Sequence, residues 1–175
     1  MTNDVGKKGH APMANKDENR KTNAMRTLDA AGVPYEAHFF DCPEALSGVE
    51  VAAACGLDPD QVFKTLVTCS KSGGHYVFMI PAAFELDLKK AACASGQKAI
   101  AMIKARELLP LTGYVHGGCS PIGMTKPFPT FIDETCDLWE TIYFSGGRIG
   151  CQIELAPDLL ERAVPGIVRA DLVVS

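Results

Sequence analysis

The sequence lacks the spacings that mark metal sites and disulfide frameworks. Its seven cysteines include no C-x-x-C pair, and its four histidines form neither H-E-x-x-H nor H-x-x-x-H. Zinc sites usually depend on such spacings, and a disulfide framework usually needs an even number of cysteines. We therefore expect reduced thiols in a cytoplasmic protein that holds no metal and no other cofactor.

Long apolar segments are also absent. No apolar run in the chain approaches the length of a membrane-spanning helix, which needs roughly 20 residues. The amino-terminal residues 1–20 are polar and lack the apolar centre of a signal peptide. We expect residues 1–20 to form a disordered tail and residues 21–175 to form one domain, with no membrane partner.

A strong positive charge is missing as well. The formal net charge is −4, whereas unaided binding to nucleic acid draws most of its affinity from lysine and arginine. The composition therefore argues against tight binding of nucleic acid, and we expect no DNA partner. A local basic surface is possible in principle, although a solvated helix face explains its residues equally well; these are Lys89, Lys90, Lys98, Lys104 and Arg106.

Short strands and short helices alternate along the chain. Helical spacing and capping signals predict helices at residues 22–31, 51–55, 87–94 and 106–109, and from residue 157 onward. Ser47 and Glu50 form an S-x-x-E capping box before the second of these helices, which Gly56 ends, and Gly96 ends the third. Apolar runs predict strands at residues 33–40, 62–68, 75–80, 98–103, 114–116, 130–133, 140–144, 149–155 and 167–174. The Lys-Ser-Gly-Gly turn at residues 71–74 predicts that the second and third of these strands form a hairpin. This pattern favours an α+β domain around a mixed, curved, barrel-like sheet over a doubly wound α/β fold.

A glycine-rich segment stands out at residues 117–123, which read Gly-Gly-Cys-Ser-Pro-Ile-Gly. Glycines around a Ser-Pro step expose backbone N–H groups that can hold a carbonyl or phosphate oxygen. A tight turn between strands is the simpler alternative for any such segment considered alone.

Lys64 interrupts an otherwise apolar strand. Val62 and Leu66 share its face, while Phe63 and Val67 share the other, so neither face resembles open solvent. A lysine in this setting either reaches an edge of the sheet, where it discourages aggregation, or lines a cavity in which its ammonium meets a polar substrate.

Conventional nucleophilic catalysis has little support. His38, His75 and His116 show no spacing to Ser120 or Cys119 that marks a catalytic triad. We interpret each as a strand histidine. Cys119 is interpreted as a small apolar filler within the glycine-rich segment.

Three segments together resemble a known family. The Val-Phe-Lys-Thr-Leu strand is followed by Gly-Gly-x-Ser-Pro-x-Gly, and then by Ser-Gly-Gly at residues 145–147 with Ile-Glu-Leu at residues 153–155. In this order they resemble the YbaK family of free-standing aminoacyl-tRNA deacylases, relatives of the editing domain inserted in bacterial prolyl-tRNA synthetases. The resemblance covers residues 21–173 and implies an α+β editing domain.

The resemblance also implies roles for single residues. Lys64 matches the essential functional lysine of the family. Gly118 and Ser120 would line the substrate pocket, while Ser145 and Gly146 would form a second wall, with the Ser145 hydroxyl able to donate a hydrogen bond. For residues 145–147 a hairpin turn is the simpler alternative.

Two further positions are less regular. Phe40 matches a pocket position that is often aromatic in the family, although a core phenylalanine is the simpler interpretation from the sequence. Gln152 departs from the family pattern, because some relatives carry an aspartate there. An acid role is therefore absent at this position, and Gln152 can contribute only hydrogen bonds.

The family resemblance implies a trans-editing hydrolase acting on mischarged Cys-tRNA(Pro), and also on Cys-tRNA(Cys), with prolyl-tRNA synthetase as a partner. The thiol of the substrate would attack the ester, so that cysteine can leave as a thiolactone. Two alternatives stay open at this point. One is a deacylase for tRNA charged with alanine or another small amino acid, and the other is a non-catalytic module that binds tRNA or a synthetase.

Overall fold

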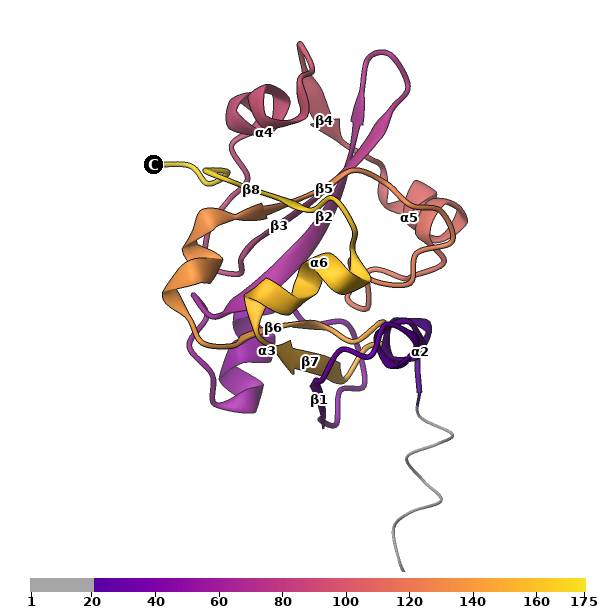
Figure 1. Ribbon diagram of the computed structural model, residues 1–175, viewed down its shortest axis with the longest axis vertical. Coiled ribbons are helices and arrows are strands. Elements are labelled where there is room, and N and C mark those ends of the chain that lie inside the picture. Colours follow the sequence, from indigo (N-terminus) through magenta and orange to yellow (C-terminus); the bar gives the residue numbers. More distant parts are fainter. Residues whose placement is uncertain (1–20) are drawn as a thin grey trace, which may run out of the picture.

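A mixed sheet of eight strands forms the centre of the protein (Figure 1). The computed structural model describes residues 21–175, so the tail predicted for residues 1–20 lies outside the described residues. The strands are β1 Glu36–Phe39, β2 Val62–Ser70, β3 His75–Pro81, β4 Ile100–Met102, β5 Thr130–Asp133, β6 Ile142–Ser145, β7 Cys151–Leu155 and β8 Val168–Ala170.

Within residues 21–175, five short α-helices flank the sheet. They are α2 Asn23–Ala30, α3 Gly48–Cys55, α4 Leu88–Ser95, α5 Ala105–Thr112 and α6 Leu160–Ala163. Two 3₁₀ turns are also present: η1 Glu134–Leu138 follows β5, and η2 Pro157–Leu159 precedes α6. Within the described part of the chain, no helix is both long enough and apolar enough to cross a membrane.

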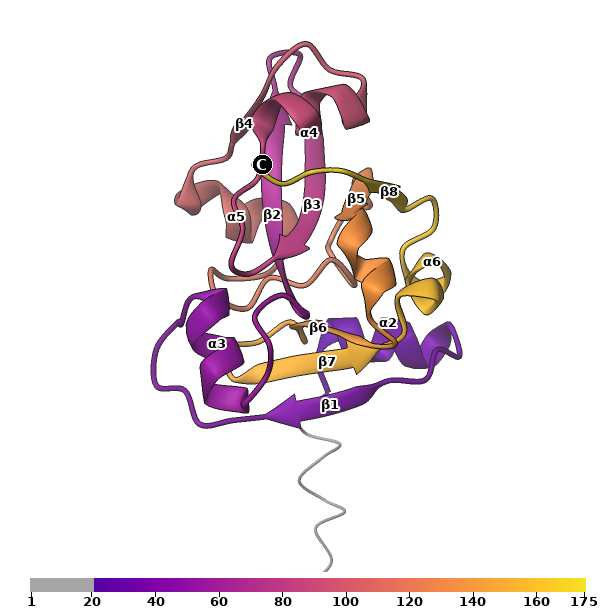
Figure 2. The same cartoon turned by 90° about the vertical axis from the view of Figure 1, so that its left-hand side faces the viewer.

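The strand order is β1-β7-β6-β2-β3-β5-β8, and β4 adds to β2. The pairs β2–β6, β3–β5 and β5–β8 are parallel, whereas the other pairs are antiparallel. Figure 2 shows that β1 and β7 run across the direction of β2 and β3, so the sheet is strongly curved. The predicted α+β architecture with a mixed, curved sheet is confirmed.

One edge of β2 is left open in its middle. Strand β3 pairs with one edge of β2. Along the other edge, β6 pairs with residues 62–63 and β4 pairs with residues 68–70. Neither β4 nor β6 pairs with residues 64–66. Along this edge the Gln61 carbonyl accepts from Tyr143 N (3.1 Å), and the Val67 carbonyl accepts from Ile103 N (3.3 Å). In a strand, the backbone groups of every second residue point to the same edge. The backbone N–H and C=O of Thr65 therefore point toward the opening.

The helix that flanks this opening ends at the residue expected from the sequence, but it begins at Gly48, three residues before the predicted start. The Ser47 hydroxyl accepts from Glu50 N (3.3 Å), and the Glu50 carboxylate accepts from Ser47 N (2.8 Å). This capping box satisfies two N–H groups at the start of α3. Gly56 then ends the helix in the left-handed conformation, with φ of +66°.

Different helices cover the two faces of β6 and β7. Phe144 and Ile153 pack with Met25 of α2 and Leu160 of α6 in the largest apolar cluster. On the opposite face, Tyr143 packs near α3, which lies beside β7 in Figure 2. The side of these strands that faces α3 therefore continues toward the open edge of β2.

Two local expectations are wrong. Residues 114–116 form no strand, because Gly113 turns the chain at the end of α5 with φ of +80° and the Tyr114 hydroxyl donates to Ile122 O (2.6 Å). The segment is thereby folded back into the glycine-rich loop. The helical turn predicted at residues 106–109 is longer than expected, since α5 continues through Pro110 to Thr112.

The predicted basic surface is only partly available. Lys90 forms an ion pair with Asp171 (2.9 Å) and donates to Val173 O (2.8 Å), so it anchors the C-terminal segment. Lys89, Lys98 and the start of α5 are exposed to solvent.

Candidate active site

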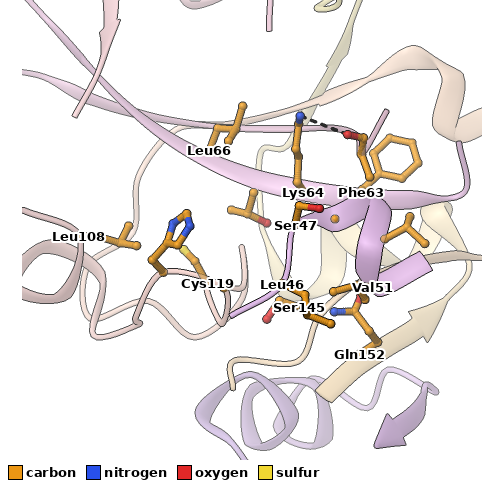
Figure 3. Close-up of a pocket in the computed structure, with 16 residues that line it drawn as sticks. Leu46, Ser47, Val51, Phe63, Lys64, Leu66, Leu108, Cys119, Ser145 and Gln152 are labelled. Atoms are coloured by element: carbon orange, nitrogen blue, oxygen red, sulfur yellow. Dashed lines mark hydrogen bonds between the residues drawn. The ribbon is translucent and has the colours of Figure 1, made fainter. Parts of the chain in front are cut away.

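A cavity of about 320 Å³ lies at the open edge of β2 (Figure 3). The start of α3 and its preceding loop form one side, the loop after α5 forms another, and the ends of β6 and β7 close it. Its lining residues are Leu46, Ser47, Gly48, Val51, Val62, Phe63, Lys64, Thr65, Leu66, Ala82, Leu108, His116, Gly117, Cys119, Ser145 and Gln152. The cavity has room because neither β4 nor β6 pairs with residues 64–66 of β2.

Lys64 is the charged group of this cavity. Its Nζ donates to Ala82 O at 3.3 Å, as the dashed line in Figure 3 shows, and within residues 21–175 no carboxylate lies at ion-pairing distance from it. Burial lowers the pKa of Lys64, and the charge of Glu85 opposes this only in part. The result is a half-buried ammonium with donors to spare, which suits the oxygen atoms of an ester or a phosphate.

Ser145 and Gln152 lie opposite each other on β6 and β7. The Ser145 hydroxyl accepts from Gly147 N at 3.2 Å, which leaves its own O–H free to donate into the cavity. Gln152 is buried, with 6% of its surface exposed, and its Oε1 has no hydrogen-bond partner. Of the residues proposed from the sequence, Lys64, Ser145 and Gln152 are thus brought together in one cavity.

The glycine-rich loop contributes less directly than expected. Gly117 and Cys119 line the cavity, whereas Gly118 and Ser120 do not. Gly118 N donates to Val115 O (3.0 Å), and the Ser120 hydroxyl is buried and accepts from Ile122 N (3.3 Å). These groups are used within the loop, so the substrate contacts predicted for Gly118 and Ser120 stay predictions.

The glycines allow close packing of neighbouring loops. A Cβ on Gly118 would lie 3.0 Å from Ile149 N, and a Cβ on Gly117 would lie 2.6 Å from the Ala45 Cβ. Gly117 also has a φ of +83°, which favours glycine. The loop therefore holds the cavity wall by its shape.

Gly146 has a similar structural role. A Cβ at this position would collide with Cys151 Sγ, and the Gly146 carbonyl accepts a hydrogen bond from the Thr22 hydroxyl. Gly146 lies outside the cavity lining. Gly146 therefore supports the cavity wall through the neighbouring Ser145, and its predicted contact with the substrate stays a prediction.

Phe40 lies in a second hollow of about 370 Å³, formed by residues 39–41 and 148–150. Phe40 N donates to Gly150 O (2.9 Å), and the Arg148 guanidinium lies 5.7 Å from the centre of the Phe39 ring. Phe40 is not part of the cavity around Lys64, so its predicted contact with the substrate stays a prediction.

Cys119 is unsuited to act as a nucleophile. It is buried, and this burial raises the pKa of its thiol to about 12, against a smaller opposing effect of Thr112. The thiolate is the reactive form of cysteine, and it is scarce at neutral pH for such a group. The packing agrees with the interpretation of Cys119 as an apolar filler.

A cluster of possible metal ligands lies on β1 and β7. Single ligand atoms of Glu36, His38 and Glu154 lie within 4.8 Å of one another. His38 Nε2 contacts Glu154 Oε2 at 2.8 Å, and Thr141 donates to the other oxygen at 2.8 Å. These contacts already provide hydrogen-bond partners for His38 and Glu154 at part-buried positions outside the cavity lining. This cluster was not predicted, because His38 and Glu154 are far apart along the chain.

Sequence inspection also missed several cavity residues. Thr65, Ser47 and His116 line the cavity, and Thr65 Oγ1 is buried without a hydrogen-bond partner. The nearest available signal for Thr65 was its place next to Lys64 on the same strand. Ser47 was identified only as a helix cap.

The chain is similar to proteins of known family. The family model described as the aminoacyl-tRNA editing domain matches residues 42–163. An Enterococcus faecalis protein named as a Cys-tRNA(Pro)/Cys-tRNA(Cys) deacylase, EbsC, is 46% identical over 149 residues, which span 85% of this chain and 91% of that protein.

Solved structures show the same fold. A trans-editing enzyme for prolyl tRNA synthetase matches with a TM-score of 0.78 and 25% identity, over 87% of this chain and 96% of the other. A hypothetical protein matches with a TM-score of 0.79 and 24% identity, over 87% of this chain and all (100%) of the other, and supports the fold alone. The chain belongs to the aminoacyl-tRNA editing domain family, which confirms the resemblance predicted from its motifs.

Proposed function

We propose that this member of the aminoacyl-tRNA editing domain family is a trans-editing deacylase that hydrolyses Cys-tRNA(Pro) and Cys-tRNA(Cys). The observation that carries the proposal is Lys64, which lines a small cavity and whose half-buried ammonium has no carboxylate partner among the described residues. The 46% identity to a protein named for these two substrates supports the same assignment.

The cavity has a suitable size. Its volume of about 320 Å³ is at the small end of the range of ligand pockets, about 300–1,000 Å³. A short aminoacyl group together with part of the terminal ribose fits that size. Its walls are mostly apolar, with a few polar groups at the centre, as expected of a site that orients a small ligand.

In the proposed reaction the substrate supplies its own nucleophile. The cysteinyl sulfur attacks the ester carbonyl carbon, the bond from that carbon to the ribose oxygen breaks, and the thiol proton passes to the ribose oxygen. The products are free tRNA and a cysteine thiolactone, which water then opens to cysteine. Intramolecular attack is efficient because the reacting atoms are already held together.

Lys64 stabilises this reaction electrostatically. Negative charge develops on the carbonyl oxygen during attack, and a preorganised donor directed at that oxygen lowers the barrier. Ser145 is positioned to donate a second hydrogen bond from the end of β6. The buried, protonated Cys119 takes no part.

The need for such an activity follows from the limits of selective binding. A small apolar pocket discriminates between similar side chains by only about 1–3 kcal/mol. A synthetase that accepts proline therefore also charges some cysteine, and a second hydrolytic site removes the error.

Prolyl-tRNA synthetase is the proposed partner. With a net charge of −4, the chain has little general affinity for tRNA phosphates. Association with the synthetase would raise the effective concentration of the newly mischarged tRNA. Because tRNA charging supplies the substrate, we place the reaction in the cytoplasm.

A deacylation panel tests the proposal. Single-turnover rates are measured on Cys-tRNA(Pro), Cys-tRNA(Cys), Ser-tRNA and Ala-tRNA(Pro). We expect rapid loss of cysteine from both cysteinyl substrates and much slower loss of serine, whose hydroxyl has the same position but is a weaker nucleophile. Preferred cleavage of Ala-tRNA(Pro) would instead show attack by water, and no cleavage of any substrate would indicate a binding module.

A further inference from the structure

Two buried oxygen atoms of residues that line the cavity have no hydrogen-bond partner. Within residues 21–175, Thr65 Oγ1 and Gln152 Oε1 are the buried side-chain polar atoms without one, and both residues line the cavity. Buried polar groups are nearly always paired, and leaving one unpaired is unfavourable. Gln152 Oε1 can only accept and the Thr65 hydroxyl can accept or donate, so the two atoms point to a ligand that brings a donor.

These acceptors come from two different walls. Thr65 lies on the open edge of β2, where its backbone C=O also points away from β3. Gln152 lies on β7, opposite Ser145 of β6. A group that enters the opening of the sheet therefore meets acceptors from both β2 and β7.

The ligand must bring donors of its own to this place. An aminoacyl ester has many oxygen acceptors, and Lys64 suits those. Its main donor is the α-ammonium group, which carries three N–H donors and no acceptor. Since Lys64 repels a second cation, the ammonium is driven away from Lys64 and toward neutral acceptors.

We infer that Thr65 and Gln152 bind the α-ammonium group of the aminoacyl substrate and thereby orient its carbonyl toward Lys64. The inference rests on the proposed function for the identity of the substrate. Hydrogen bonds from a charged donor are short and strong even when the acceptor is neutral. Thr65 and Gln152 act as positioning residues, because neither takes part in bond making.

The amide at position 152 is suited to this task. Among the residues that the structure describes, no aspartate or glutamate lines the cavity. A carboxylate at position 152 would attract the Lys64 ammonium as well as the substrate ammonium. It would then compete with the ester oxygen for interaction with Lys64. A neutral amide oxygen accepts from the ammonium and leaves the Lys64 charge available.

Binding of non-hydrolysable analogues tests the inference directly. The probes are adenosine carrying cysteine in a 3′-amide linkage and the matching 3-mercaptopropionyl amide, which keeps the thiol and lacks the amine. Calorimetry should show that the wild type binds the amine-bearing probe at least tenfold more tightly. In Thr65→Val and in Gln152→Leu that ratio should fall toward one, through weaker binding of the amine-bearing probe alone.

A matched control is available on the same strand. Thr68 is buried, and its hydroxyl donates to Tyr76 O (2.9 Å) outside the cavity lining. Thr68→Val removes an equivalent hydroxyl and should leave the binding ratio unchanged. Gln152→Met serves as the second variant at position 152 if Gln152→Leu does not fold, as judged by circular dichroism.

The possible outcomes separate this inference from the proposed function. Equal binding of the two probes by the wild type, or an unchanged ratio in either folded variant, would overturn the role of Thr65 and Gln152. A protein that prefers the amine-bearing probe but does not deacylate Cys-tRNA would support the inference and refute the proposed reaction.

Discussion

Replacement of Lys64 by methionine should abolish deacylation and leave the fold intact. Lys64→Met keeps the aliphatic stem and removes the ammonium. The one hydrogen bond lost is the 3.3 Å contact with Ala82 O, and the half-buried charge no longer has to be desolvated. These effects oppose each other, so we expect the free energy of unfolding to change by less than about 1 kcal/mol. Loss of one preorganised donor to an oxyanion lowers rates by about 10²–10³, or roughly 2.7–4 kcal/mol of barrier.

The difference in stability between the wild type and this variant should also depend on pH in a defined direction. Burial lowers the pKa of Lys64 in the folded state below its ordinary value of 10.5. The unfavourable charge is therefore fully present below the folded-state pKa and is relieved as pH rises toward 10.5. Any stability advantage of Lys64→Met over the wild type should be greatest at neutral pH and should shrink above it. Wild-type deacylation should weaken over the same rise in pH as the ammonium is lost.

The assay pairs single-turnover deacylation of Cys-tRNA(Pro) with urea unfolding followed by circular dichroism. Lys89→Met is the control, because Lys89 is exposed on α4 and lies outside the cavity lining. We expect the control to keep wild-type activity and stability. A folded Lys64→Met protein with a rate within tenfold of the wild type would refute the electrostatic role of Lys64.

Three further predictions concern loop shape, the enzyme thiol and a buried acid. Gly117→Ala should destabilise the fold by more than Gly73→Ala in urea unfolding, since both glycines have positive φ (+83° and +91°) but only Gly117 meets a neighbour, the Ala45 Cβ at 2.6 Å; equal losses would remove the packing argument. Cys119→Ala should keep its deacylation rate, because a pKa of about 12 leaves about one thiolate in 10⁵ at pH 7, and a tenfold loss in a folded variant would contradict this. Asp133→Ala should lose at least about 3 kcal/mol of stability, since its carboxylate accepts from Thr135 N (3.1 Å), the Thr135 hydroxyl (2.6 Å) and Leu172 N (2.9 Å). The exposed Asp137→Ala should cost under about 1 kcal/mol, and comparable losses at the two positions would show that burial of Asp133 is unimportant.

Local signals in the sequence predicted most of the elements because their causes are local. The capping box at Ser47 and Glu50 involves side chains three residues apart, and the left-handed glycines at positions 56 and 96 end α3 and α4 as expected. The β2–β3 hairpin was likewise predicted from two apolar runs around a glycine turn. Such contacts depend on a few neighbouring residues, so the sequence displays them.

The wrong expectation at residues 114–116 has a non-local cause. Apolar Tyr114 and Val115 read as part of a strand, but the Tyr114 hydroxyl is bound to the glycine-rich loop and no strand lies beside it to pair with. Strand preference is a property of the environment more than of the backbone. Without the position of the neighbouring strands, the sequence could not distinguish the two outcomes.

The residues of the site likewise divide into those with a local signal in the sequence and those without one. Lys64 was identified because a charge in an apolar strand is anomalous within a few residues. Thr65 was missed because threonine is ordinary in a strand, and only the absence of a neighbour makes it unusual. That absence is decided by β6, which leaves β2 after Phe63, and by β4, which joins it at Thr68.

The open edge of β2 also explains why the motifs of this chain lie so far apart. A cavity inside a continuous sheet would require buried backbone groups without partners, which is unfavourable unless a ligand supplies them. Here three separate segments surround a gap in one strand ladder: the start of α3, the loop after α5, and the paired ends of β6 and β7. Each segment was visible in the sequence as a cap, a glycine-rich loop or a Ser-Gly-Gly turn. Their common purpose becomes apparent only when the gap at residues 64–66 is seen to be the place where the three segments meet.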